Sequence, residues 1–298
     1  MKILIPCFAL AGTSFFLSSC SEPPANEKDT EDASQVTISA QPGFEILFNG
    51  KDLTGWKGNP DNWKVENGVI VGTTTEEAPL PYNQFLIWEG APLENFELTA
   101  ELKLISDGNN SGIQYRAEVR PDLGDYVVSG YQCDMHPAIW ANGMLYDEKG
   151  RGILCKRGMK AVITPEGKAK QVGDLPMEPE FVTADWNTYK ITAQGNHIVH
   201  EVNGVQTVDV YDHHEDERDL AGVLAFQIHK GPAMRVEIRN IALKRLPSTK
   251  ITSPDQTPVP ADAPDVHPPK KKAAPKAKGP GKAAEKAKAA PAAGAPKE

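Results

Sequence analysis

Apolar and polar side chains alternate along several short stretches in the middle of the chain. Between residues 96 and 104, apolar Phe, Leu and Ala occupy every second position, and polar residues fill most positions between them. A period of two is typical of a β-strand that buries one face. Similar runs predict further strands at Trp63–Val71, Ser111–Val119, Tyr131–Met135, Trp186–Ala193, His197–Val202, Val223–His229 and Met234–Leu243.

Turn signals separate these runs. Gly is paired with Asn or Asp at residues 67–68, 107–108, 195–196 and 203–204. Such pairs readily adopt the positive φ angles that tight hairpin turns require. The clearest hairpin joins His197–Val202 to Gln206–Val210 through Asn203 and Gly204. Many short strands without a long helical pattern predict an all-β fold, either a sandwich or a barrel.

Composition divides the 298 residues into a foldable middle and two ends that differ from it. We predict one domain over residues 43–247, because about 200 residues are ample for a single sandwich core. Residues 20–42 include an acidic, Pro-containing stretch with little to bury, which predicts a flexible tether. Residues 248–298 are rich in Pro, Ala and Lys, and they predict a disordered tail.

The first 19 residues predict a lipoprotein signal peptide. Met1 and Lys2 precede an apolar run that ends at Leu17 and is too short to span a membrane. Cys20 follows Leu-Ser-Ser, which resembles a bacterial lipobox, so we expect a lipid on its thiol to anchor the exported protein. Ser21 favours the outer membrane, since it is not the Asp of the inner-membrane retention signal. The alternative is an ordinary signal peptide that ends at a Cys by accident.

The net charge of −8 combines a basic tail with a more acidic remainder. Nucleic acid is therefore not an expected partner of the domain. The tail could bind an anionic envelope polymer, although a solvated spacer without a partner is favoured. Cys133 and Cys155 lie in the body of the chain, and the sequence leaves a disulfide and two buried thiols equally open.

Three of the predicted strands carry polar side chains on one face and apolar side chains on the other. The polar set is Gln114, Arg116, Gln132, Asp134, Gln227 and His229, and Thr99 and Glu101 would complete it. If these strands share a sheet, the set forms one polar surface flanked by Tyr126, Trp140 and Tyr146. Amides and charges suit sugar hydroxyls, and aromatic rings suit the apolar sugar face. The alternative is the ordinary solvated face of an antiparallel sheet.

Three other segments carry side chains that could form a site. The charged, Gly-containing loop Tyr146–Gly152 could cap the polar surface or be an exposed turn, with neither favoured. His213 and His214 lack the spacing of metal ligands, so a solvated loop is favoured. Residues 107–110 offer oxygen ligands for Ca²⁺ but lack the acidic terminal ligand of an EF-hand, so a turn is favoured.

A series of motifs in a fixed order gives the middle of the chain a specific resemblance. The motifs are Leu47–Trp56 (LFNGKDLTGW), Trp63–Gly68 (WKVENG), Asn110–Arg116 (NSGIQYR), Gly130–Asp134 (GYQCD), Trp186–Asn187, Val202–Gly204, Gln227–His229 (QIH) and Ile238–Ile241 (IRNI). In this order they resemble the 3-keto-disaccharide hydrolase domain family over nearly all of Phe44–Leu246. The resemblance implies a concanavalin-like jelly-roll sandwich of two antiparallel sheets.

The resemblance also implies an enzyme that cleaves glycosides carrying a ketone at C3. A base would remove the C2 proton, the aglycone would leave from C1, and water would add back. His229, Glu101 and Asp134 are the candidate bases, and Arg116 is the candidate for stabilising the enolate. Gln114, Gln132, Gln227, Tyr146 and Trp140 are the expected sugar-binding residues.

Two alternatives to this chemistry stay open. Glu101, Asp134 and His229 could together hold a divalent cation that polarises the ketone. The domain could instead be a non-catalytic, lectin-like module that binds a glycan at the cell surface, because such sandwiches bind sugars without chemistry. Turnover of a 3-keto glucoside separates an enzyme from a binding module.

Overall fold

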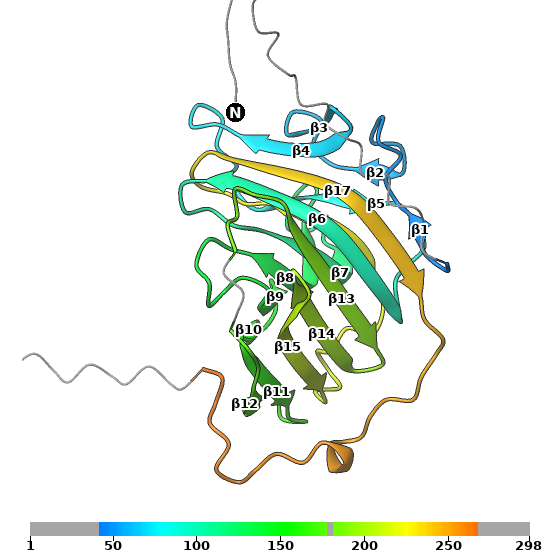
Figure 1. Cartoon of the computed structure of the whole chain (residues 1–298), viewed down its shortest axis with the longest axis vertical. Helices are drawn as coiled ribbons and strands as arrows, with labels where there is room; N and C mark the ends of the chain where they lie inside the picture. Colours follow the sequence, from blue (N-terminus) through cyan, green and yellow to red (C-terminus); the bar gives the residue numbers. More distant parts are fainter. Residues whose placement is uncertain (1–41, 178–180, 268–298) are drawn as a thin grey trace, which may run out of the picture. The chain divides into compact units, whose positions relative to one another are not determined.

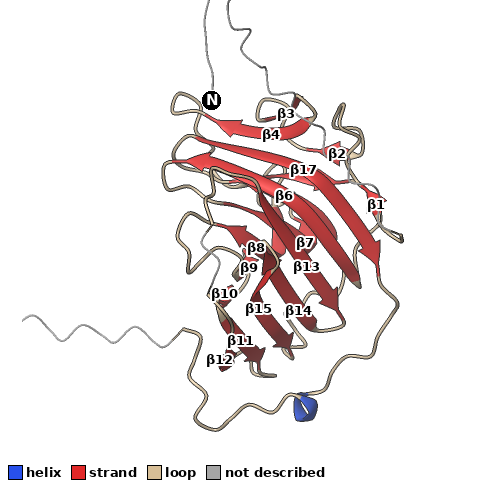
Figure 2. Ribbon diagram, in the orientation of Figure 1, coloured by secondary structure: helices blue, strands red, loops and turns tan. Residues whose placement is uncertain are grey.

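The computed structural model describes residues 42–177 and 181–267. The predicted signal peptide, Cys20, nearly all of the tether and residues 268–298 lie outside the described residues, so their assignments stay predictions. Regular structure in the described part is β-strand, apart from a short 3-10 helix at Pro254–Gln256 (Figure 2). Within this part, no helix has the length and apolar character needed to cross a membrane.

The strands form two sheets. Sheet A has ten strands in the order β12, β11, β15, β14, β13, β6, β17, β4 and β3, with β1 paired to β17. Its strands are β1 (Glu45–Ile46), β3 (Trp63–Glu66), β4 (Val69–Thr74), β6 (Phe96–Ser106), β11 (Met159–Ile163), β12 (Ala169–Asp174), β13 (Asn187–Gln194), β14 (His197–Val202), β15 (Val205–Asp212) and β17 (Met234–Arg245). Neighbours in sheet A are antiparallel except β11 and β15, which run parallel.

Sheet B has seven strands in the order β10, β9, β8, β7, β16, β5 and β2. Its strands are β2 (Trp56–Lys57), β5 (Gln84–Trp88), β7 (Ser111–Val119), β8 (Val128–Met135), β9 (Leu145–Glu148), β10 (Gly152–Cys155) and β16 (Val223–Ile228). All of its pairs are antiparallel. The chain crosses between the sheets at β1 to β2, β2 to β3, β4 to β5, β5 to β6, β6 to β7, β10 to β11, β15 to β16 and β16 to β17, as expected for a jelly roll.

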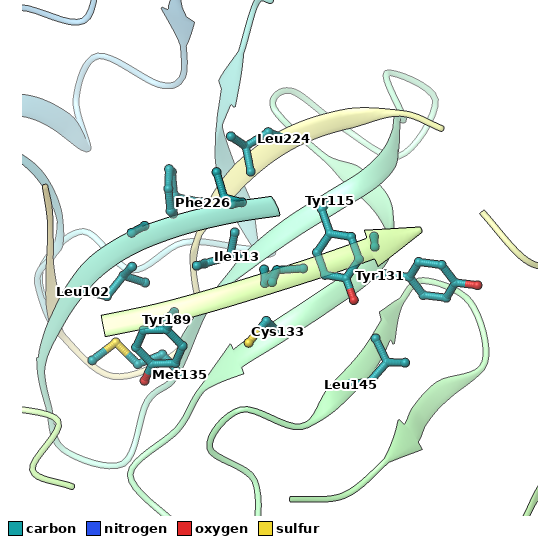
Figure 3. Close-up of a cluster of buried hydrophobic side chains, with 14 of the residues drawn as sticks. Leu102, Ile113, Tyr115, Tyr131, Cys133, Met135, Leu145, Tyr189, Leu224 and Phe226 are labelled. Carbon is teal, nitrogen blue, oxygen red and sulfur yellow. The ribbon is translucent and has the colours of Figure 1, made fainter. Parts of the chain in front are cut away.

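The core lies between the two sheets and is built by the alternation seen in the sequence. Leu102 and Tyr189 from sheet A meet Ile113, Tyr115 and Phe226 from sheet B in one buried cluster (Figure 3). Each large apolar side chain that is fully buried contributes roughly 1.5–3 kcal/mol relative to exposure. The predicted fold class, an all-β sandwich of two mainly antiparallel sheets, is confirmed.

The predicted hairpin at Asn203 and Gly204 is also confirmed. It joins β14 to β15, and its two turn residues have φ angles of 51° and 78°. The run Trp63–Val71 is a hairpin of β3 and β4, because the Asn67-Gly68 pair turns the chain in its middle. Cys133 and Cys155 are both buried, free thiols, which settles the alternative that the sequence left open.

The segment that follows β17 packs against the sandwich, so the prediction of a disordered tail from residue 248 is wrong for residues 248–267. We call these residues the C-terminal strap; Figure 1 shows them leaving β17 and running towards β12. Asn196 donates a hydrogen bond to the Thr252 carbonyl at 3.0 Å and accepts one from its N–H at 2.9 Å. Val266 is 2% exposed within the core cluster, and its N–H donates to the Ala169 carbonyl at 3.0 Å. Main-chain hydrogen bonds and one buried Val therefore hold a segment whose composition suggested disorder.

Candidate functional site

Strands β7, β8 and β16 lie side by side in sheet B, as the polar pattern required. Gln114 is opposite Gln132, and Ala225 is opposite Gln114. Their apolar neighbours fill the core, so the polar side chains point to the outer face of the sheet. Gln114, Gln132, Asp134 and Gln227 are nevertheless no more than 2% exposed. They form a buried polar layer and not a solvated face.

An amide chain connects the members of this layer. The amide groups of Gln114 and Gln132 lie 2.7 Å apart. Gln132 donates a short hydrogen bond to the Asp134 carboxyl, and its Nε2 lies 3.5 Å from Oε1 of Gln227. Gly112 makes room for this arrangement, because a Cβ atom there would lie 2.8 Å from the Gln132 side chain. The Gly of the NSGIQYR motif therefore leaves space for the Gln132 side chain in the polar layer.

Asp134 lies at the end of the amide chain. The pKa of its carboxyl is raised to about 8, because burial, with a smaller contribution from the neighbouring Glu148, outweighs the lowering effect of the Gln132 hydrogen bond. At neutral pH, Asp134 is therefore mainly protonated. A carboxylic acid that titrates near pH 7 can donate or accept a proton during a reaction.

The ends of β9 and β16 meet at a second group of polar residues. Asn83 donates to Oε1 of Glu148 at 3.4 Å and accepts a hydrogen bond from the Lys230 N–H at 3.1 Å. Nζ of Lys149 lies 3.0 Å from Oε1 of Glu148. Asn83 thus ties the end of β16, where His229 follows, to the end of β9. Asn83, Glu148 and Lys149 were not among the predicted site residues, although Glu148 shares the outward parity of Tyr146.

His229 carries the ring nitrogen best suited to act as a base. Its Nδ1 makes a hydrogen bond to the Lys230 carbonyl, so in the neutral ring Nδ1 bears the proton and Nε2 bears the lone pair. Burial lowers the pKa of His229, with smaller opposing contributions from that hydrogen bond and from Glu148. Burial also lowers the pKa of His136, and His229 lowers it further. The ring of His229 is therefore neutral at pH 7.

The two predicted aromatic residues have different neighbours. Tyr146 is opposite Gln132 in the register of β8 and β9. Burial raises the pKa of its phenol, and the charges of Glu148 and Asp134 raise it further. Trp140 is 47% exposed, and its ring centroid is 6.0 Å from that of His136. The structure therefore places Tyr146 near Asp134, and Trp140 near His136.

Arg116 does not belong to this layer, and the prediction that it stabilises an enolate is wrong. It lies at a bulge in β7, with a φ angle of 49°, where the regular alternation of faces is broken. Its guanidinium donates to the main-chain carbonyls of Glu94 and Gly195, at 2.8 Å each, and of Asp219 at 3.2 Å. The side chain is 1% exposed. Arg116 therefore holds the backbone together and does not face a substrate.

Glu101 lies in sheet A, apart from the other predicted site residues. Its carboxylate accepts hydrogen bonds from Nε of Arg239 at 2.7 Å and from Nδ2 of Asn240 at 2.9 Å. The predicted cation set of Glu101, Asp134 and His229 is therefore not assembled. Across residues 42–177 and 181–267, no three His, Cys, Asp or Glu side chains are grouped so as to hold a metal ion.

Comparisons with known proteins agree with the sequence resemblance. Residues 43–244 match a family described as the 3-keto-alpha-glucoside-1,2-lyase-like domain. The comparison with curated proteins found no match. A solved structure named a "putative glycosyl hydrolase", from Parabacteroides distasonis, is 21% identical, with 69% of this chain and 94% of that chain covered and a TM-score of 0.46.

Two further solved structures are similar at lower identity. The carbohydrate binding module CBM66 from Bacillus subtilis is 13% identical, with 64% of this chain and 95% of that chain covered and a TM-score of 0.42. SCLam, a non-specific endo-beta-1,3(4)-glucanase, is 12% identical, with 70% and 94% covered and a TM-score of 0.44. The family match spans most of the chain and carries the assignment. The chain belongs to the 3-keto-alpha-glucoside-1,2-lyase-like domain family.

Proposed function

We propose that this protein cleaves glucosides whose C3 hydroxyl has been oxidised to a ketone. The ketone acidifies the proton on C2, so a base can remove it and leave an enolate. The enolate re-forms the ketone as the C1=C2 double bond forms and the C1–O bond breaks, and the departing oxygen takes up a proton. Water then adds across that double bond, and the net reaction is hydrolysis. The family match supports this proposal, and so do a neutral His229 and a protonated Asp134 that are both influenced by Glu148.

His229 is the proposed base. Its Nε2 carries the lone pair because Nδ1 is bonded to the Lys230 carbonyl, and burial keeps the ring neutral at pH 7. Asn83 fixes the main chain next to His229 through its contact with Lys230. General base catalysis by a positioned side chain typically contributes about 10² to 10⁴ in rate.

Asp134, and not Arg116, is the proposed residue that stabilises the enolate. A protonated carboxyl in a buried site can donate a hydrogen bond to the oxygen on which the enolate charge develops. Lys149 adds a positive charge next to Glu148, with which it forms an ion pair. Gln132 and Gln227 belong to the buried amide chain that ends at Asp134, and the partly exposed Tyr146 supplies a ring for an apolar sugar face.

The location of the protein is a separate proposal, based on the sequence of its two ends. We propose that the protein is exported, that a lipid on Cys20 anchors it to the outer membrane, and that the enzyme acts in the envelope. The lipobox-like run before Cys20 and the composition of residues 20–42 support this location. The basic residues 268–298 could contact an anionic envelope polymer.

Exchange of single histidines tests the proposed function. His229→Gln should lower kcat for release of 4-nitrophenol from its 3-keto-α-glucoside by about 10² to 10⁴. His197→Gln is the matched control, because His197 is paired with Asp209 in sheet A at 2.7 Å. Both variants should keep the wild-type melting temperature. Wild-type turnover in folded His229→Gln would refute the base assignment, while sugar binding without any release by the wild type would favour the lectin-like module.

A further inference from the structure

A second histidine lies at the same end of sheet B as the proposed base. His136 directly follows β8, and His229 directly follows β16. Both strands pair antiparallel with β7, which lies between them, so their C-terminal ends point the same way. Neighbouring strands in a sheet are about 4.8 Å apart, so β8 and β16 are separated by roughly 10 Å. One small ligand at this end of β7 can therefore be reached from both strands.

Both histidines occupy positions on the outer face of the sheet. Met135 belongs to the core cluster, so the alternation of faces directs Asp134 and His136 outward. Ile228 belongs to the same cluster, which directs His229 outward as well. The two rings also influence each other: burial lowers the pKa of His136, and the charge of His229 adds a smaller lowering effect. His136 therefore continues the polar layer towards the base.

Hydrogen bonds fix the proton on a different nitrogen in each ring. Nδ1 of His136 accepts a hydrogen bond from the Ala138 N–H at 2.9 Å, so in the neutral ring the proton is on Nε2. The lowered pKa keeps this ring neutral at pH 7. His229 has the reverse arrangement, because its Nδ1 bears the proton and its Nε2 bears the lone pair. The free nitrogen of His229 can accept a proton, whereas that of His136 can only donate a hydrogen bond.

The surroundings of His136 hold it in place. Its main-chain N–H donates to Oδ1 of Asn142 at 3.2 Å, and the same oxygen accepts a hydrogen bond from the Tyr189 hydroxyl at 2.7 Å. Asn142 and Tyr189 are fully buried, so this contact attaches His136 to the core. The ring centroid of Trp140 lies 6.0 Å from that of His136. A donor that is fixed before the substrate binds needs little reorganisation during a reaction.

We propose that Nε2–H of His136 donates a hydrogen bond to the C3 oxygen of the substrate, where the enolate charge develops. The C2 proton moves to Nε2 of His229, and the electron pair of the broken C–H bond forms the enolate. Asp134, two residues before His136 on the same face, supplies a second donor to the same oxygen. A neutral imidazole is a weak acid, so it stabilises the enolate while its own proton stays on Nε2. This assignment rests on the proposed function.

A substrate analogue without a leaving group separates this role from one at the departing oxygen. The analogue is 3-keto-1,5-anhydroglucitol, which has hydrogen at C1 in place of the glycosidic oxygen. It can form the enolate, but it cannot eliminate an aglycone. NMR in deuterated water follows the exchange of its C2 proton with solvent, against a sample without protein. Release of 4-nitrophenol from its 3-keto-α-glucoside measures the complete reaction.

Three variants test the donor. His136→Ala should slow both exchange and release by about 10² to 10³, the range found for the loss of one such donor. His136→Gln should restore both rates to within about tenfold of the wild type, because its side-chain amide can replace the Nε2–H donor. His197→Ala is the control, because His197 is paired with Asp209 in sheet A, and it should change neither rate. Thermal melts check that each variant is folded at the assay temperature.

The two rates distinguish the possible failures. Unchanged exchange in folded His136→Ala would overturn the assignment, and so would a His136→Gln variant as slow as His136→Ala. Slower release with unchanged exchange would place His136 at the departing oxygen and would also overturn it. Each of these results leaves the proposed function intact. A wild-type protein that catalyses neither exchange nor release would refute the proposed function, and the assignment of His136 with it.

Discussion

Replacing Asp134 with Asn tests whether the folded protein holds this carboxyl in its protonated form. The pKa of Asp134 is about 8 in the folded protein, against an ordinary value of 3.8. Because the folded-state pKa is the higher one, folding is accompanied by proton uptake between these values. The free energy of unfolding should therefore decrease as the pH rises from about 4 to about 8, and it should be level above pH 8.

The size of the effect follows from the same two values. Each unit of difference between the folded and the ordinary pKa corresponds to about 1.36 kcal/mol. The free energy of unfolding should therefore fall by at most on the order of 5 kcal/mol, and this limit is reached above pH 8. The amide introduced by Asp134→Asn carries no charge at any pH, and its carbonyl oxygen can accept the hydrogen bond that Gln132 donates. We therefore expect the variant to be more stable than the wild type at alkaline pH and similar to it in acid.

Thermal melts at two pH values measure this difference. For a domain of this size, 1 kcal/mol shifts the melting temperature by about 2–4 °C. The variant should melt at least about 5 °C above the wild type at pH 8.5, and no more than about 3 °C above it at pH 4.5. Asp61→Asn is the control, because Asp61 is exposed and its exchange should give no such pH dependence.

The same variant should lose activity. Without a proton to donate to the enolate oxygen, kcat should fall by about 10² to 10³. We expect a gain in stability together with a loss of turnover, because the fold keeps this carboxyl protonated at a cost in stability and the reaction needs its proton. If the variant's melting temperature is shifted equally at both pH values, or is shifted less at pH 8.5, Asp134 is ionised in the folded protein and its pKa is not raised.

Three further predictions concern other parts of the chain. Cys20→Ala should abolish labelling with radioactive palmitate in a bacterial host, and undiminished labelling would contradict the lipobox assignment. Removing residues 248–298 should lower the melting temperature by about 5 °C or more, because Val266 leaves the core, whereas removing residues 268–298 alone should not; equal melts of both truncations would contradict the role of the strap. Arg116→Ala should destabilise the fold by roughly 3 kcal/mol or more in denaturant melts, because three main-chain carbonyls lose their donor; a loss below about 1 kcal/mol would argue against this role.

The sequence predicted which residues of a strand share a face, but it did not predict the sheet to which each strand belongs. The alternation in β7, β8 and β16 correctly placed Gln132, Asp134 and Gln227 on one face. The equally regular alternation of β6 put Glu101 in the same set, although β6 lies in sheet A. Sheet membership depends on long-range pairing, and a periodic pattern carries no information about it.

Local irregularities account for the other errors. The bulge in β7 turns Arg116 away from the polar layer, and a period of two assumes that no bulge is present. Glu148 was assigned to a loop because the charges around it hide the short strand β9. The strap has few apolar residues, so its attachment through main-chain hydrogen bonds left almost no signal in the composition.

The fate of the C2 proton tests the central claim most directly. A 3-keto-α-glucoside labelled with deuterium at C2 is incubated with the purified protein, and products are followed by NMR against a sample without protein. We predict that the aglycone is released together with the deuterium from C2, and that the corresponding glucoside without the ketone is not cleaved. Release of the aglycone with the deuterium retained at C2, or equal cleavage of the glucoside without the ketone, would contradict it.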